Sequence, residues 1–151
     1  FNTGGSMSIV KLSGIKKLFS GSALSRAEQN QLAKEVLLMT LARATAADTN
    51  IKSIEVTKVR EVLLDRTGEK FTAANVRVAA NSRLYERAPF ERYLHKCSRK
   101  LNTKDRKNTL EALLEVIHAD ERVSDYEVTF FNHVARALEL TPAQIIGLSA
   151  D

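Results

Sequence analysis

Two stretches decide the fold: AADTNIKSIE at residues 46–55 and HADERVSDYE at residues 118–127. Each follows an apolar helical pattern, crosses a short turn that holds one aliphatic residue, and reaches a Glu seven residues after its Asp. A second apolar helical pattern comes next in both places. We therefore interpret each stretch as an acidic turn between two helices.

The two stretches are copies of one unit, because residues 38–59 align with residues 110–131 at an offset of 72. Leucines of the preceding helices fall opposite each other in this alignment. The sequence therefore predicts an internal duplication of a helix, acidic turn, helix unit. The acids pair as follows: Asp48 with Asp120, and Glu55 with Glu127.

Helical periodicity runs through the rest of the chain, and no stretch shows the sustained alternation of a strand. We expect an all-α, single-domain bundle of about seven helices that contains the duplicated unit. Gly68 is expected to end the second helix in the left-handed region. The helix starts are marked by Ser25 with Glu28, Thr72, Thr103, Ser124 with Glu127, and Thr141 before Pro142.

The apolar stripes of these patterns predict the core. The helix that follows the first acidic turn is expected to carry Val56, Val59, Val62 and Leu63 inward. The stripe of the helix expected at residues 26–47 consists of Ala33, Val36, Leu37, Leu41 and Ala44. The stripe of the helix that follows Ser124 consists of Val128, Phe131, Val134, Ala135 and Leu138. Cys97 shares a stripe with Phe90, Tyr93, Leu94 and Leu101, so we expect it to be a core residue.

Length and composition bound the class of protein. A chain of 151 residues fits one domain that buries a sizeable core. The lone Cys97 excludes an internal disulfide and a CxxC framework, which favours a reducing compartment, with the cytoplasm as the default. No apolar run approaches the roughly 20 residues of a membrane-spanning helix. We assign residues 1–6 to a tag remnant, 7–24 to an N-terminal amphipathic segment, and 25–151 to the helical domain.

The net charge of +5 hides a strong asymmetry. Lys and Arg outnumber Asp and Glu by 10 to 3 in residues 77–107, whereas the balance is 2 to 8 in residues 108–151. A dipolar surface of this kind favours two sorts of contact over a nucleic-acid clamp.

Asp48 and Asp120 lie where a helix is expected to end, against the negative end of its dipole. This position costs roughly 0.3 to 1 kcal/mol unless something compensates. The placement therefore needs an explanation in both halves of the chain.

The two acidic turns, each followed by an apolar helix and a Leu/Phe-Thr-x-Ala start, resemble the TerB-like family over nearly all of the chain after Met7. This family includes tellurite-resistance TerB proteins and the related domain of DjlA-type co-chaperones. The resemblance implies an all-helical fold and divalent-metal binding by Asp48, Glu55, Asp120 and Glu127. The family usually has Gly after each Asp, where this chain has Thr49 and Glu121.

For a metal site, oxygen ligands of this kind suit Ca²⁺ or Mg²⁺, with Asn50 and Asp125 as further candidate ligands. The alternative is that the same acids act only as helix caps, since Glu127 already completes a capping box with Ser124. The spacing does not fit an EF-hand loop. His95, His118 and His133 lack the spacing of a zinc site.

A basic surface is expected around the helix that carries Arg92, Lys96, Arg99 and Lys100, with Arg83 and Arg87 before it. We expect it to engage acidic protein partners, ahead of nucleic acid. Residues 7–24 are a candidate for peripheral contact with the inner membrane face, although packing on the domain is the favoured interpretation.

No catalytic constellation is present in the sequence, so we expect no enzymatic activity. The leading hypothesis is a TerB-like stress-response module that binds a divalent cation weakly and serves as a protein scaffold. The alternatives are a metal-free helical adaptor and, ranked lower, a nucleic-acid-binding protein.

Overall fold

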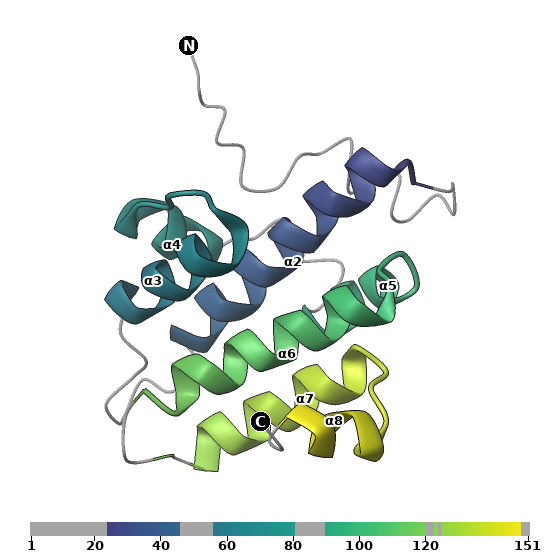
Figure 1. The fold of residues 1–151 in the computed structure, drawn as a ribbon. Helices are drawn as coiled ribbons and strands as arrows, with labels where there is room; N and C mark the ends of the chain where they lie inside the picture. Colours follow the sequence, from purple (N-terminus) through teal and green to yellow (C-terminus); the bar gives the residue numbers. More distant parts are fainter. Residues whose placement is uncertain (1–23, 46–55, 81–89, 120–122, 124, 149–151) are drawn as a thin grey trace.

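The computed structural model describes residues 24–45, 56–80, 90–119, 123 and 125–148. Within these ranges the chain is all-helical and forms a single domain of seven helices, as the sequence predicts (Figure 1). They are α2 (Arg26–Thr45), α3 (Val56–Thr67), α4 (Ala73–Ala80), α5 (Phe90–Ser98), α6 (Thr103–Ile117), α7 (Asp125–Ala137) and α8 (Pro142–Leu148).

Helix α2 is the central helix of the fold. Every residue from Glu35 to Ala42 is buried, because α3, α4, α5, α6 and α7 all pack around it. The prediction of a single apolar stripe is therefore too narrow, since Leu38 and Met39 are buried on the other sides of the helix. A helix that is apolar all round belongs in the interior rather than on one face of a bundle.

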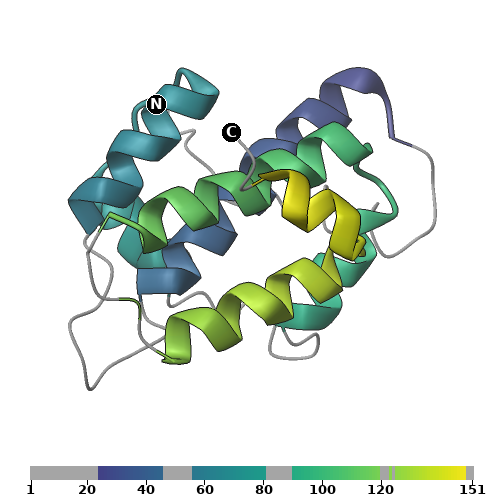
Figure 2. The ribbon, with the colours of Figure 1, turned by 60° about the horizontal axis from the view of Figure 1, so that its bottom comes forward.

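Helices α2 and α6 lie side by side in the middle of the molecule (Figure 1). Helices α3 and α4 cover one side of this pair, and α7 and α8 cover the other. Helix α5 packs against α7 and also touches α2 (Figure 2). The core is thus one continuous cluster to which six of these helices, α2 to α7, contribute buried apolar side chains.

Side-chain caps open the helices at three of the predicted places, and the predicted cap Ser124 lies outside the described residues. The backbone N–H of Glu28 donates to Ser25 Oγ at 3.2 Å, and the N–H of Ser25 donates to the Glu28 carboxylate at 2.9 Å, which is a complete capping box. Thr72 with Asn75, and Thr141 with Gln144, make the same reciprocal bonds. The predicted cap at Thr103 is wrong by one residue.

The cap of α6 is Asn102, whose side-chain oxygen accepts from the N–H of Asp105 at 2.7 Å. Asn and Thr are both good capping residues, so the sequence alone does not show which of these two adjacent residues caps the helix. The extended backbone of Asn102 places its side chain over the first turn, and Thr103 becomes the first helical residue.

Two helices end in left-handed backbone. Gly68 follows α3 with φ +76°, as predicted, and Glu139 follows α7 with φ +56°. The N–H of Leu140 bonds to the Ala135 carbonyl at 3.2 Å and the N–H of Glu139 to the Arg136 carbonyl at 3.0 Å, which together form a Schellman motif. A glutamate in this conformation is unusual, and its side-chain contacts are described below.

Replacing Gly68 by alanine is expected to lower the free energy of unfolding by about 1 kcal/mol, because a Cβ strains this backbone conformation. An added Cβ would meet no atom within 4 Å, so the loss measures backbone strain alone. Urea unfolding of Gly68→Ala and Gly68→Asn tests this. Asparagine tolerates the left-handed region and should lose less, and equal stability of all three chains would contradict the assignment.

The buried face of α7 differs from the predicted one at its first turn. Val128 is 47% exposed, whereas Glu127 is only 6% exposed. Glu127 lies seven residues before Val134 and therefore on the same side of the helix, while Val128 lies at the edge of that side. Phe131, Val134, Ala135 and Leu138 do face the core, as predicted.

The segments assigned to residues 1–6 and 7–24 lie outside the described residues, apart from Leu24, which packs against the core. In the described part of the chain, no helix combines the length and the apolar composition that crossing a membrane requires.

Candidate functional site

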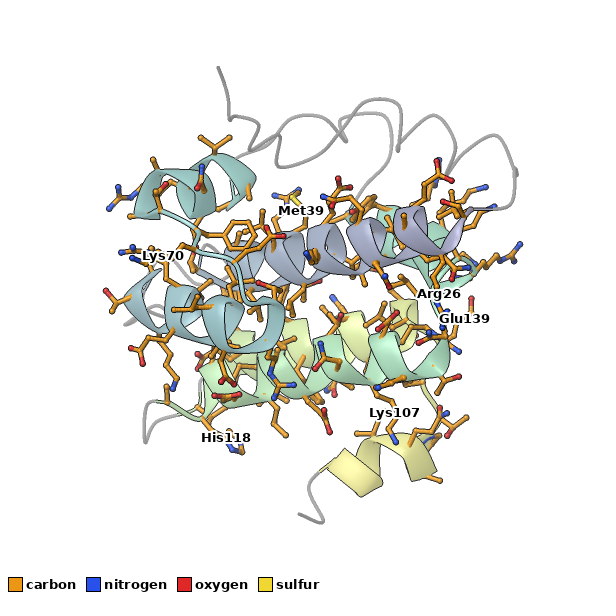
Figure 3. All side chains as sticks on the ribbon, turned by 45° about the horizontal axis from the view of Figure 1, so that its top comes forward. Arg26, Met39, Lys70, Lys107, His118 and Glu139 are labelled. Carbon is orange, nitrogen blue, oxygen red and sulfur yellow. The ribbon has the colours of Figure 1, made fainter. Side chains whose placement is uncertain are left out.

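The helices that flank the two acidic turns meet at one end of the molecule. Helix α2 ends at Thr45 and α6 ends at Ile117, which are 72 residues apart, the same offset that aligns the two turns. The two helices run in the same direction, so their C-terminal ends lie together (Figure 1). His118, which follows α6, lies at the opposite end of the molecule from Arg26, the first residue of α2 (Figure 3).

Ion pairs hold the start of α3 against the end of α6 at this end of the molecule. Lys58 Nζ lies 4.0 Å from the Glu115 carboxylate. Arg66, about two turns further along α3, donates to Glu115 at 3.1 Å and to Asn108 at 2.6 Å, and lies 3.6 Å from Glu111. Helix α3 of the first half is therefore fixed to α6 of the second half.

The predicted metal ligands are only partly described. Glu127 lies in the first turn of α7 with a buried side chain, and Asp125 lies in the same turn with an exposed one. The other predicted ligands, Asp48, Asn50, Glu55 and Asp120, lie outside the described residues. Among the residues that are described, no group of three or more His, Cys, Asp or Glu side chains could hold a metal ion.

The basic face is built on α5. Its buried side presents Tyr93, Leu94, Cys97 and Ser98 to the core, and this leaves Arg92 and Lys96 exposed. After the helix ends, Arg99 is exposed and Lys100 is half-buried. Arg83 and Arg87 lie outside the described residues.

Other arginines have structural roles. Arg106 donates to the Leu138 carbonyl at 2.9 Å, which satisfies the C-terminal end of α7. Arg60 donates to the Phe71 carbonyl at 2.8 Å.

Two histidine–glutamate pairs join α5 to α7 and to the turn that follows α7, and no local motif in the sequence predicts them. His95 Nδ1 lies 3.0 Å from the Glu139 carboxylate, and His133 Nδ1 lies 3.2 Å from the Glu91 carboxylate. Ser98 also donates to Glu139 at 3.3 Å. These contacts give Glu139 a role that glycine could not fill in the left-handed position after α7.

Cys97 is fully buried on the inner side of α5, as predicted. Burial raises the pKa of its thiol, and the hydrogen bond with Tyr93 opposes this change only in part. A thiol that stays protonated and covered is a poor nucleophile and a poor redox centre.

The fold and these surfaces define a small all-helical domain with exposed basic residues on and directly after α5. The family described as "Tellurite resistance protein TerB" matches residues 21–150, and the chain belongs to this family. No curated protein and no solved structure matches the chain.

Proposed function

We propose that this chain is a TerB-type stress-response module that binds a divalent cation of the Ca²⁺ or Mg²⁺ type at the acidic turns that follow α2 and α6. The module engages acidic protein partners through the basic face of α5. The ligands would be Asp48, Glu55, Asp120 and Glu127, with Asn50 and Asp125 as further candidates. We place this activity in the cytoplasm, without enzymatic turnover.

The observation that carries the metal proposal is the convergence of two helix C-termini, each followed by an acidic turn. Each helix end carries a partial negative charge of about half an electron. Acids that follow both ends add to this negative potential, which a bound cation would neutralise. Carboxylate and amide oxygens are the ligands that hard cations prefer.

The position of Glu127 gives further support. This carboxylate begins the helix that directly follows the second acidic turn. A cation bound there would fix the two turns relative to each other and so order the surface that partners contact.

A metal-free helical adaptor is the second candidate, and the capping boxes favour it. Thr72 with Asn75 and Thr141 with Gln144 use the same spacing as Ser124 with Glu127. In that case the acids stabilise helix ends and the protein acts through its surfaces alone.

Titration calorimetry with CaCl₂ and MgCl₂ tests the metal proposal. The wild-type chain should bind at least one of the two ions, and Asp120→Asn should weaken binding by at least about tenfold, since affinity follows the number of charged ligands. Asp65→Asn, which changes an exposed acid of α3, is the matched control and should leave binding unchanged.

Thermal melts with and without EDTA separate the two candidates. Metal ligation predicts that Asp120→Ala loses stability only when the metal is present. Capping predicts a loss of about 0.5 to 2 kcal/mol in both conditions. Saturable heats that are the same for the wild type and Asp120→Asn would rule out this ligand set.

A further inference from the structure

A pocket of about 390 Å³ opens between α5 and α7. Its walls are mainly apolar, and a carboxylate and an imidazole complete its lining. The lining residues are Phe90, Glu91, Leu94, Phe130, His133 and Val134.

We infer that this pocket is the anchor point for an acidic protein segment, which inserts one apolar side chain between α5 and α7 while its carboxylates contact the basic face of α5. The inference rests on the proposed role of that face and specifies how it recognises a partner. Recognition of this kind is helix-in-groove binding, in which one buried anchor side chain supplies much of the affinity.

The walls of the pocket are formed before any partner binds. The rings of Phe90 and Phe130 stack with their centroids 6.1 Å apart and their planes 4° from parallel. The guanidinium of Arg43 lies 5.3 Å from the centre of the Phe90 ring, and Leu94 and Val134 are buried in the core. Because these side chains are already packed, an inserted group would meet fixed apolar surface and would lose little affinity to ordering of the pocket.

The size of the pocket favours a single side chain over a large ligand. Its volume lies at the low end of the range for small-molecule sites, and it is partly open to solvent. Glu91 and His133, paired at 3.2 Å and about half exposed, leave polar atoms beside the apolar walls. A protein segment suits such a site, because one apolar side chain can fill the pocket while the polar backbone of the segment lies beside Glu91 and His133.

The charges around the pocket select an acidic partner. Arg92 and Lys96 are exposed on the helix that supplies Phe90 and Leu94, and Arg99 is exposed directly after this helix ends. Arg136 is exposed on α7, three residues after His133 and so one turn further along the helix. Both helices that form the pocket therefore carry exposed cations, and acidic side chains on a partner would speed association and fix the orientation of the segment.

Binding of labelled peptides to the full chain, measured by fluorescence anisotropy, tests the inference. The probes are helical peptides of about 15 residues. One is rich in Glu with a central Phe, the second has Ala in place of the Phe, and the third keeps the Phe but has Gln in place of every Glu. We expect the acidic Phe peptide to bind at least about tenfold more tightly than either of the others at low salt.

Substitutions at Glu91 test whether the Phe side chain of the peptide binds in the pocket or elsewhere on the surface. Glu91→Trp places a bulky ring at the rim, so the preference for the Phe peptide over the Ala peptide should fall to less than about twofold. Glu91→Gln keeps the pocket open and should retain the preference. Melting curves of both variants confirm that the chain remains folded.

Charge reversals test the basic face separately. Arg99→Glu should weaken both acidic peptides, whereas Lys70→Glu should not. Lys70 is exposed in the turn between α3 and α4, at the opposite end of the molecule from Glu139, which contacts α5 (Figure 3).

The outcomes separate this inference from the proposed function. Equal affinity for the Phe and Ala peptides, together with sensitivity to Arg99→Glu, would overturn the anchor pocket and leave an acidic-partner face. Failure of every acidic peptide to bind would overturn both. Equal binding of the Gln peptide, or binding only to vesicles of phosphatidylglycerol, would show an apolar or lipid site and overturn the acidic partner.

Discussion

Replacing Leu63 by alanine is expected to lower the free energy of unfolding by about 2 to 5 kcal/mol. Leu63 is 0% exposed and lies on the side of α3 that packs against α2, α4 and α6. Its removal leaves a cavity between α3 and the helices that α3 packs against, and the ion-paired α3–α6 contact limits how far the helices can close it.

The next residue provides a matched control. Leu64 has the same side chain on the same helix but is 44% exposed. Leu64→Ala should cost less than about 1 kcal/mol, because little apolar surface returns to water and alanine favours the helix. Urea unfolding of both variants measures the difference. Losses of similar size would mean that α3 does not pack in this orientation.

The sequence predicted this inward side of α3 correctly because α3 has neighbours on one side only. Of the four predicted residues, Val59, Val62 and Leu63 are buried, and Val56 is partly buried against the core. For α2 the apolar stripe predicts too few buried residues, because a stripe does not show how many other helices will pack around the helix. Leu38 and Met39 are buried through contacts with helices that are distant in sequence.

The error at Val128 has a related cause. In the first turn of α7 a helical repeat can be drawn through either Val128 or Glu127, and hydrophobicity alone favours valine. The packing of α7 on α5 and α6 instead turns Glu127 toward the core, so its side chain is buried and that of Val128 is exposed. A local pattern cannot predict this, because the rotation of a helix is set by its tertiary contacts.

The candidate sites differ in how far they can be predicted from the sequence alone. The acidic turns are contiguous motifs, so they can be predicted as a repeat, although only Glu127 and Asp125 of the predicted ligands are described. The pocket between α5 and α7 joins residues about 40 positions apart, such as Phe90 with Phe130. No local spacing links those two helices, and only the tertiary contact brings the residues together.

The thiol of Cys97 is expected to react at least about a thousandfold more slowly with Ellman's reagent in the folded chain than in urea. Full burial excludes the reagent, so the reaction requires an opening of the core whose free energy approaches that of global unfolding. Rapid reaction of the folded chain would show that α5 detaches from the core. Slow reaction would argue that any role of this protein in tellurite resistance does not use a cysteine thiolate.

The same burial predicts how stability depends on pH. Because the pKa of Cys97 is raised in the folded state, the unfolded thiol ionises first, near its ordinary value of about 8.5. The stabilisation is therefore complete below about pH 8.5 and falls as the pH rises, with the unfolding equilibrium constant growing up to about tenfold per pH unit.

Comparison with Cys97→Ala isolates this contribution from the titration of other groups. The variant should be less stable at pH 7, because it leaves a small cavity. The wild type should then lose about 2 kcal/mol more than the variant between pH 7 and pH 10. Parallel stability curves for the two chains would mean that the folded thiol ionises as easily as the unfolded one, which a fully buried position on the inner side of α5 does not allow.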